Sequence, residues 1–214
     1  MAAAVELSGV TKDFGHMKAL RGVNLSFGRG EKTSLLGPNG AGKSTLLRIV
    51  AAQMVPSSGS VRVLGYDAQR QREEVKRRIG VVGHRSFLYD ELTVLENLRF
   101  YGSFHGSTQE DYDRVIALTG LDRWRDVKAG VLSYGLRKRG DISRALLGDP
   151  DLLLLDEFFS GLDVETSSSL AQHLKRLDDK TIIVSSHSPE HVQSFCTRTV
   201  YLRGGMVERD VGPT

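Results

Sequence analysis

A glycine-rich segment of nine residues has the composition and spacing of a phosphate-binding loop. Glycine adopts backbone angles that are closed to other residues, so successive N–H groups of such a loop converge on an anion. Lys43 adds a positive charge for the outer phosphates of a nucleotide, and the Ser44 hydroxyl is suited to bind Mg²⁺. A glycine-rich turn that only joins a strand to a helix is the alternative. Because the whole pattern matches, we predict nucleotide binding by Gly37, Pro38, Asn39, Gly40, Ala41, Gly42, Lys43, Ser44 and Thr45.

Two adjacent carboxylates lie further along the chain. Asp156 and Glu157 follow the apolar run of residues 152–155, as expected for a buried parallel strand that delivers acids to its carboxyl end. Because side chains alternate along a strand, the two acids project differently. This arrangement allows Asp156 to bind Mg²⁺ and Glu157 to act on an attacking water. A strand that simply ends in two solvated acids is the alternative interpretation.

One histidine follows a second apolar run. His187 comes directly after residues 182–186, where another buried strand should end at the same edge of the sheet. A lone histidine is more often structural than catalytic. This placement nevertheless predicts a contact with the γ-phosphate or a role in orienting the attacking water. Lys43, Glu157 and His187 are therefore the predicted catalytic residues.

The alternation of apolar runs and amphipathic segments predicts an α/β fold with a largely parallel sheet. Between residues 93 and 148 the apolar residues recur at helical spacing instead. We predict one domain, residues 1–214, with a helical subdomain inserted at about residues 85–148. Further helices are predicted at 44–52, 73–78, 164–177 and 189–195. Strands are predicted at 5–10, 23–27, 33–36, 59–64, 79–82, 152–155, 182–185, 199–202 and 206–211.

The composition of the chain indicates its cellular compartment and the kinds of partner that it could bind. The chain has 29 basic and 26 acidic residues, a balance too even to indicate nucleic acid as a partner. It contains no stretch of about 18 apolar residues that would span a bilayer, and its first residues do not resemble a secretory signal. Cys196 is the single cysteine, which suits a reducing compartment and a partly buried apolar role. We therefore expect a cytoplasmic location.

Together with residues 132–139, which we call the signature segment, these motifs resemble the nucleotide-binding domains of ABC transporters over nearly the whole chain. The resemblance implies the P-loop NTPase fold with an N-terminal antiparallel β portion. It also implies that Ser133 and Gly135 contact the γ-phosphate of ATP held by an opposite subunit. Tyr134 stands where the family has glycine, and Leu136 where it has glutamine. Leucine in place of glutamine removes a hydrogen-bond donor, and tyrosine in place of glycine adds a bulky ring where the second subunit docks.

Other family positions carry over one at a time. Phe14 matches the aromatic residue that stacks on adenine, although a core role is an equal alternative. Asp163 matches the acid of the loop that couples the two sites. His84 stands where the family has the glutamine that links Mg²⁺ to the helical subdomain, and an imidazole is also a metal ligand. Phe158 stands where the family has proline, an exchange without an obvious chemical meaning.

The resemblance implies ATP and Mg²⁺ as cofactors and two kinds of partner. One is a second copy of the chain or a homologous ATPase subunit, and the other is an integral membrane permease. The chain would then be a peripheral ATPase on the inner face of the cell membrane that powers transport. Gly83, His84 and residues 92–100 look like the ATPase subunit of the haem-handling exporter of cytochrome c maturation, and drug or other small-molecule exporters are the alternative. A soluble ABC ATPase without a permease and a nucleotide-gated module with little hydrolysis stay open.

Overall fold

The computed structural model describes residues 3–212, which form two β-sheets and a group of helices. The smaller sheet is antiparallel, in the order β2-β1-β4-β5. Long hydrogen-bonded pairing between its first two strands starts from the turn at Gly15, which has a positive φ of 60°. This sheet is the expected N-terminal antiparallel portion, and its strands are β1 (Ala3–Phe14), β2 (Met17–Gly28), β4 (Ser58–Val63) and β5 (Tyr66–Asp67).

The larger sheet has six strands in the order β10-β9-β3-β8-β7-β6. Five of these strands are parallel, and only β10 runs antiparallel to its neighbour β9. The strand β7 consists of four leucines that are all buried, as expected for a central parallel strand covered on both faces. The strands are β3 (Lys32–Leu36), β6 (Ile79–Val82), β7 (Leu152–Leu155), β8 (Thr181–Ser186), β9 (Arg198–Arg203) and β10 (Met206–Val211).

Side chains of the six-stranded sheet alternate between two hydrophobic cores. Leu152 and Leu154 pack into the core shared with the antiparallel sheet and α1 (Lys43–Val50). Leu153 and Leu155 pack into the core on the other face, which includes residues of α6 (Val164–Lys175). Side chains that alternate along β7 thus pack into a core on each face of the sheet, and helices contribute to both cores.

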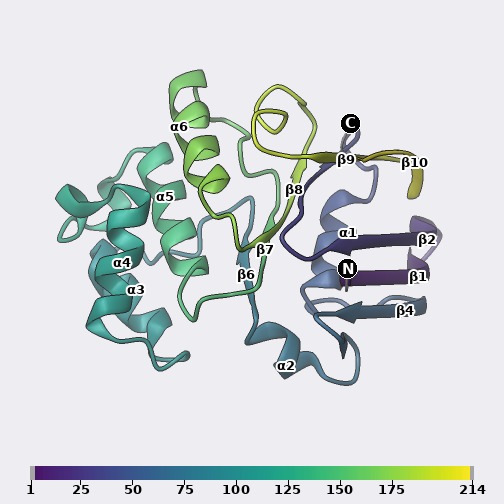
Figure 1. Cartoon of the computed structure of the whole chain (residues 1–214), viewed down its shortest axis with the longest axis horizontal. Helices are drawn as coiled ribbons and strands as arrows, with labels where there is room; N and C mark the ends of the chain where they lie inside the picture. The colour runs from purple at the N-terminus through teal and green to yellow at the C-terminus, as the bar shows by residue number, and fades with distance from the viewer. Residues whose placement is uncertain (1–2, 213–214) are drawn as a thin grey trace.

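Three α-helices between β6 and β7 form the helical part of the chain. They lie together on the left of Figure 1, on the opposite side of the large sheet from β1, β2 and β4. A capping box of Thr93 and Glu96 fixes the start of the first helix, and the Ser133 side chain caps the last. The helices are α3 (Val94–Gly102), α4 (Gln109–Thr119) and α5 (Tyr134–Ala145), with short 3₁₀ turns at Asp122–Trp124 and Ala129–Val131.

One helix expected from the sequence does not form. Residues 189–195 make a series of turns, in which the amides of Val192 and Gln193 both bond to the Pro189 carbonyl. A helix of about two turns has few hydrogen bonds to offset the cost of its first turn. The other predicted helices are present, and α2 (Arg72–Lys76) ends two residues before the expected end of the charged segment at Arg78. Within residues 3–212 no helix is both long and apolar enough to cross a membrane.

Candidate nucleotide-binding site

The predicted phosphate loop, the acidic pair and the predicted catalytic histidine lie at the carboxyl edge of the large sheet. The central strands β3, β8 and β7 are neighbours and run parallel, so the segments that follow them meet at one edge. The phosphate loop, residues 37–45, follows β3. Asp156 and Glu157 follow β7, and His187 follows β8. Residues from three separate parts of the sequence are therefore brought together by the strand order.

The phosphate loop requires glycine at two tight positions. Gly37 has φ 154°, and a Cβ there would lie 2.2 Å from the carbonyl oxygen of Leu202. Gly42 has φ 103°, and a Cβ there would lie 2.7 Å from the carbonyl oxygen of Ala19. Any larger residue would push the loop away from the strands behind it. The loop thus packs closely on the sheet and leads directly into α1, whose first amides are free to bind an anion.

The Lys43 side chain folds back over the phosphate loop. It is buried, and Nζ donates to the carbonyl oxygens of Gly37 at 2.7 Å and Pro38 at 3.2 Å. The same nitrogen forms an ion pair with Glu157, with 3.1 Å between Nζ and Oε1. Phosphate oxygens are suitable substitutes for these oxygen partners. The lysine is therefore placed where an anion bound by the loop would meet it.

Ser44 and Asp156 join at a second point of the site. The Ser44 hydroxyl donates to Oδ1 of Asp156 at 2.8 Å. The Ser185 hydroxyl donates to the same oxygen at 2.7 Å. Hydroxyl and carboxylate oxygens are the ligands that Mg²⁺ prefers, and the ion usually keeps phosphate oxygens and waters as well. Ser44 and Asp156 fit that donor set, whereas residues 3–212 contain no group of three or more acidic, histidine or cysteine side chains able to hold a metal.

Glu157 is held between two cationic or polar neighbours. His187 Nδ1 lies 2.9 Å from Oε2 of Glu157, opposite the contact with Lys43. Burial raises the pKa of Glu157, but the hydrogen bonds and charges of His187 and Lys43 outweigh that effect and lower it below its usual range. The carboxylate is therefore ionised at neutral pH and available to accept a proton from water.

The backbone at Glu157 is in a conformation that non-glycine residues seldom adopt. Its φ is 47°, and its amide donates to the Ser185 hydroxyl at 2.8 Å. Left-handed backbone at a non-glycine residue persists when surrounding contacts hold it in place, and such positions cluster at functional sites. Ser185 is thus bonded to both acids. It was not among the predicted site residues, although a serine inside an apolar buried strand was a visible signal.

A pocket of about 300 Å³ surrounds the phosphate loop. One wall comes from the loop itself together with Glu157, and the other comes from the hairpin of β1 and β2. Phe14 lies on the hairpin wall with 45% of its surface exposed, and Lys12 Nζ is 5.2 Å from the centre of its ring. A half-exposed aromatic ring beside a phosphate loop is suited to stack on a base. The core role that sequence left open for Phe14 is therefore wrong.

The signature segment is brought to a different place. Ser133 is exposed at the start of α5 and does not line the pocket around the phosphate loop. Gly135 approaches α6 so closely that a Cβ would lie 2.6 Å from Thr166 Cγ2. Asp163 caps α6 by accepting from the Thr166 amide at 2.8 Å, and Tyr134 donates to the Ser160 carbonyl at 3.2 Å. The structure thus joins the signature segment to the loop that bears Asp163, apart from the chain's own pocket.

His84 borders a second and larger cavity. This cavity, of about 620 Å³, lies between α1 and the segment after β6, and Asp156 lines it as well. The His84 side chain is exposed, and its backbone oxygen accepts a hydrogen bond from Lys138. His84 therefore shares a cavity with the predicted magnesium ligand Asp156. Its own bonding in the structure is through the backbone.

A parallel sheet with a phosphate loop, an acidic pair and a signature segment defines an ATP-binding cassette. The sequence matches the ABC transporter family over residues 20–160. It is 38% identical to the ABC transporter ATP-binding protein NatA of Bacillus subtilis, over 89% of this chain and 80% of that protein. It is 36% identical to a Nod factor export ATP-binding protein I of Rhizobium, over 94% of this chain and 68% of that protein.

The fold leads to the same family. The dimeric structure of the bacterial ABC transporter cassette MJ0796 superposes with a TM-score of 0.89, at 31% identity over 98% of this chain and 99% of that one. The same cassette is also known in a post-hydrolysis state bound to ADP and Pi, with a TM-score of 0.88. The chain belongs to the ABC transporter family and is an ATP-hydrolysing subunit of that family.

Proposed function

We propose that Glu157 is the general base of ATP hydrolysis in this chain. Its ionised carboxylate takes a proton from the water that attacks the γ-phosphate, and His187 fixes its orientation through Oε2. Lys43 moves from the loop carbonyls and Glu157 to the outer phosphates and offsets their charge. The ion pair between Lys43 and Glu157 then breaks as ATP binds. The ion pair between these two side chains is the observation that carries this assignment.

Mg²⁺ would be held by Ser44 and Asp156. When bound, the ion supplies positive charge that stabilises the phosphates of ATP. The chain's own contribution is to orient the Asp156 carboxylate, through the hydroxyl of Ser185 that donates to it. His84, on the cavity that Asp156 lines, is the third candidate ligand.

ATP is bound between two subunits in this proposal. Phe14 and the phosphate loop hold the nucleotide on one chain, while Ser133 and Gly135 of a second copy or a homologous subunit close over its γ-phosphate. Two observations support this arrangement. Ser133 and Asp163 are exposed and lie outside the chain's own nucleotide pocket, and the related MJ0796 cassette is dimeric. Asp163 lies next to the signature segment, where it joins the two sites of such a dimer.

The dimer drives an integral membrane permease from the inner face of the cell membrane. The cargo that we favour is a small molecule that leaves the cell, because one relative is a Nod factor export ATP-binding protein. The particular candidate indicated by Gly83, His84 and residues 92–100 is the haem-handling exporter of cytochrome c maturation. Exporters of drugs or other small molecules are the second candidate, and the Nod factor export relative favours export in general.

Co-purification tests this function. The tagged Glu157→Gln variant, loaded with ATP and Mg²⁺, is expected to retain a permease from detergent-solubilised membranes of the source cell. The doubly changed variant Lys43→Ala, Glu157→Gln is the control, since it should not hold ATP and should retain less permease. Cytochrome c maturation subunits would support the haem exporter, and another permease would identify a different exporter. Ribosomal or DNA-associated proteins, or no ATP-dependent partner, would contradict the proposal.

A further inference from the structure

A lysine side chain is buried where three segments of the site meet. Lys138, on α5, is 2% exposed, and its Nζ donates to the backbone oxygens of Gly83 and His84, each at 3.0 Å. The same nitrogen lies 5.5 Å from the ring centre of Tyr134 and 5.9 Å from that of Phe158. The lysine thus contacts the segment after β6, the first residue of α5 and the segment after β7.

This position is unusual for a lysine. Removing an ammonium group from water is costly, so lysine is seldom fully buried without a specific set of partners. The hydrogen-bond partners of Lys138 are backbone oxygens rather than carboxylates. The aromatic faces of Tyr134 and Phe158 add attraction for a cation in a site that excludes water. Burial lowers the pKa of Lys138, and the charges of Asp141 and Asp156 act in the opposite direction. The carbonyl oxygens and the two rings therefore offset part of the cost of burying this side chain.

Both rings belong to residues at which the chain departs from the pattern that its resemblance to the family implies. Tyr134 stands where ABC cassettes have glycine and Phe158 where they have proline, and neither glycine nor proline offers an aromatic face. In the structure the rings lie on the same ammonium group, and Phe158 is fully buried. The exchanges are therefore parts of one packed cluster, which consists of Tyr134, Lys138 and Phe158.

Two further charged residues of α5 bond to β6 and to the segment that follows it. Asp141 is buried and its Oδ1 accepts from the Phe87 amide at 3.0 Å. Arg144 donates through Nη2 to the Val81 carbonyl. With Lys138 they are spaced three residues apart and so lie along one side of the helix. Residues 81–87, which include His84, are thus fastened to α5 at three points.

We propose that Lys138 is a positioning residue that fixes the signature segment relative to the segments that carry Glu157 and His84. Phe158 directly follows Glu157 in the chain, and Ser133 caps the helix that bears Lys138. Because α5 is rigid over one turn, the contacts of the Lys138 ammonium group set the distance from Ser133 to the segments that carry Glu157 and His84. The inference rests on the proposed roles of Ser133 and Glu157. It predicts that Lys138 supports turnover without contacting ATP.

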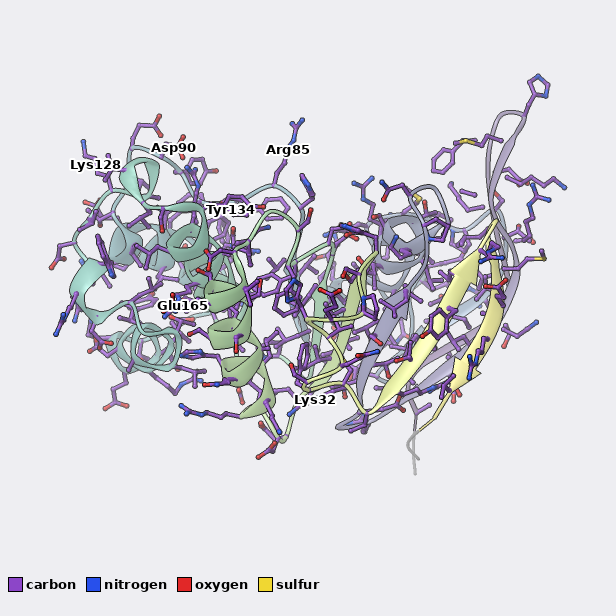
Figure 2. The ribbon with its side chains drawn as sticks, turned by 90° about the horizontal axis from the view of Figure 1, so that it is seen from above. Lys32, Arg85, Asp90, Lys128, Tyr134 and Glu165 are labelled. Atoms are coloured by element: carbon purple, nitrogen blue, oxygen red, sulfur yellow. The ribbon has the colours of Figure 1, made fainter. Side chains whose placement is uncertain are left out.

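The test replaces Lys138 by methionine, which has a similar length but no charge and no donor. Lys32→Met is the matched control. Lys32 is 8% exposed, its Nζ donates to the Lys175 carbonyl at 2.6 Å, and it lies well apart from Tyr134 in Figure 2. We expect kcat for ATP in Lys138→Met to fall by about tenfold or more, the loss that removal of a hydrogen bond to a charged group produces. KM for ATP should stay within about threefold of wild type.

Three measurements, which are Tm, kcat and ATP affinity, distinguish a positioning role of Lys138 from a general effect on stability. Thermal denaturation of both variants shows whether the chain folds, and Lys32→Met should keep the wild-type kcat even where its Tm falls. If Lys138→Met does not fold, Lys138→Gln, which keeps a donor, should fold and show lowered kcat with unchanged ATP affinity. An undiminished kcat in the Lys138 variants, or an equal loss in Lys32→Met, would overturn the inference alone. A wild-type chain without ATP hydrolysis would overturn it together with the proposed function.

Discussion

Lys43 and Glu157 form an ion pair in which Nζ lies 3.1 Å from Oε1. The lysine comes from the phosphate loop and the glutamate from the end of a strand two positions away in the sheet. Each group thereby has a charged partner within the chain. A bound triphosphate would compete with Glu157 for Lys43, so the pair connects substrate binding to release of the general base.

The ion pair predicts a pH-dependent part of the stability. The pKa of Glu157 is lower in the folded chain than its ordinary value, because His187 and Lys43 favour the carboxylate. Its contribution is therefore present at neutral pH and is lost as the pH falls from about 5 through the folded pKa. The Tm advantage of wild type over Glu157→Gln should shrink on acidification. A constant difference between pH 7 and pH 4 would contradict the pairing.

Ser185→Ala is expected to loosen the positioning of both Asp156 and Glu157. The variant removes the donor to Asp156 and the acceptor for the Glu157 amide. We predict a loss of about tenfold in kcat, in line with loss of a residue that orients a metal ligand, and a higher Mg²⁺ requirement. Ser34→Ala is the matched control, since that buried strand serine bonds to Thr199 instead. Steady-state ATPase assays across Mg²⁺ concentrations would refute this role if both variants behaved alike.

Phe14→Ala is expected to weaken ATP binding. Loss of a ring that stacks on a base reduces affinity by about tenfold or more. Isothermal titration with ATP measures the change, and Phe104→Ala serves as the control because that exposed aromatic side chain lies in the helical part of the chain. An affinity equal in both variants would remove Phe14 from the site.

Cys196 is expected to react slowly with thiol reagents. Burial raises the pKa of its thiol to about 12, so almost none is thiolate at pH 8, the form that reacts. Modification should be slow in the folded chain and should accelerate when denaturant restores the ordinary pKa of about 8.5. Rapid modification of the native chain would show that the thiol is exposed.

The sequence was most informative where chemistry is local. The phosphate loop is a continuous motif, and its constraints at Gly37 and Gly42 are visible in the spacing alone. The apolar runs before Asp156 and His187 likewise predicted strands that end at one edge, because parallel strands share their direction. The family resemblance added the prediction of the P-loop NTPase fold and of its N-terminal antiparallel portion.

The contacts of Ser185 and Lys138 could not be predicted in the same way. Ser185 reaches Asp156 only because β8 lies beside β7, and Lys138 reaches Gly83 only because α5 packs on the segment after β6. Such partners are far apart in sequence, and no periodic pattern specifies them. The turns at 189–195 were missed for a related reason, since a short apolar spacing does not reveal whether enough hydrogen bonds follow to complete a helix.

This chain is expected to hydrolyse ATP with Glu157 as the base. Steady-state ATP hydrolysis of wild type and Glu157→Gln tests it most directly, with Glu110→Gln, an exposed exchange in the first turn of α4, as the control. We expect kcat to fall by about a hundredfold or more in Glu157→Gln, with ATP affinity unchanged and full activity in the control. Equal turnover in wild type and Glu157→Gln would show that Glu157 is not the base.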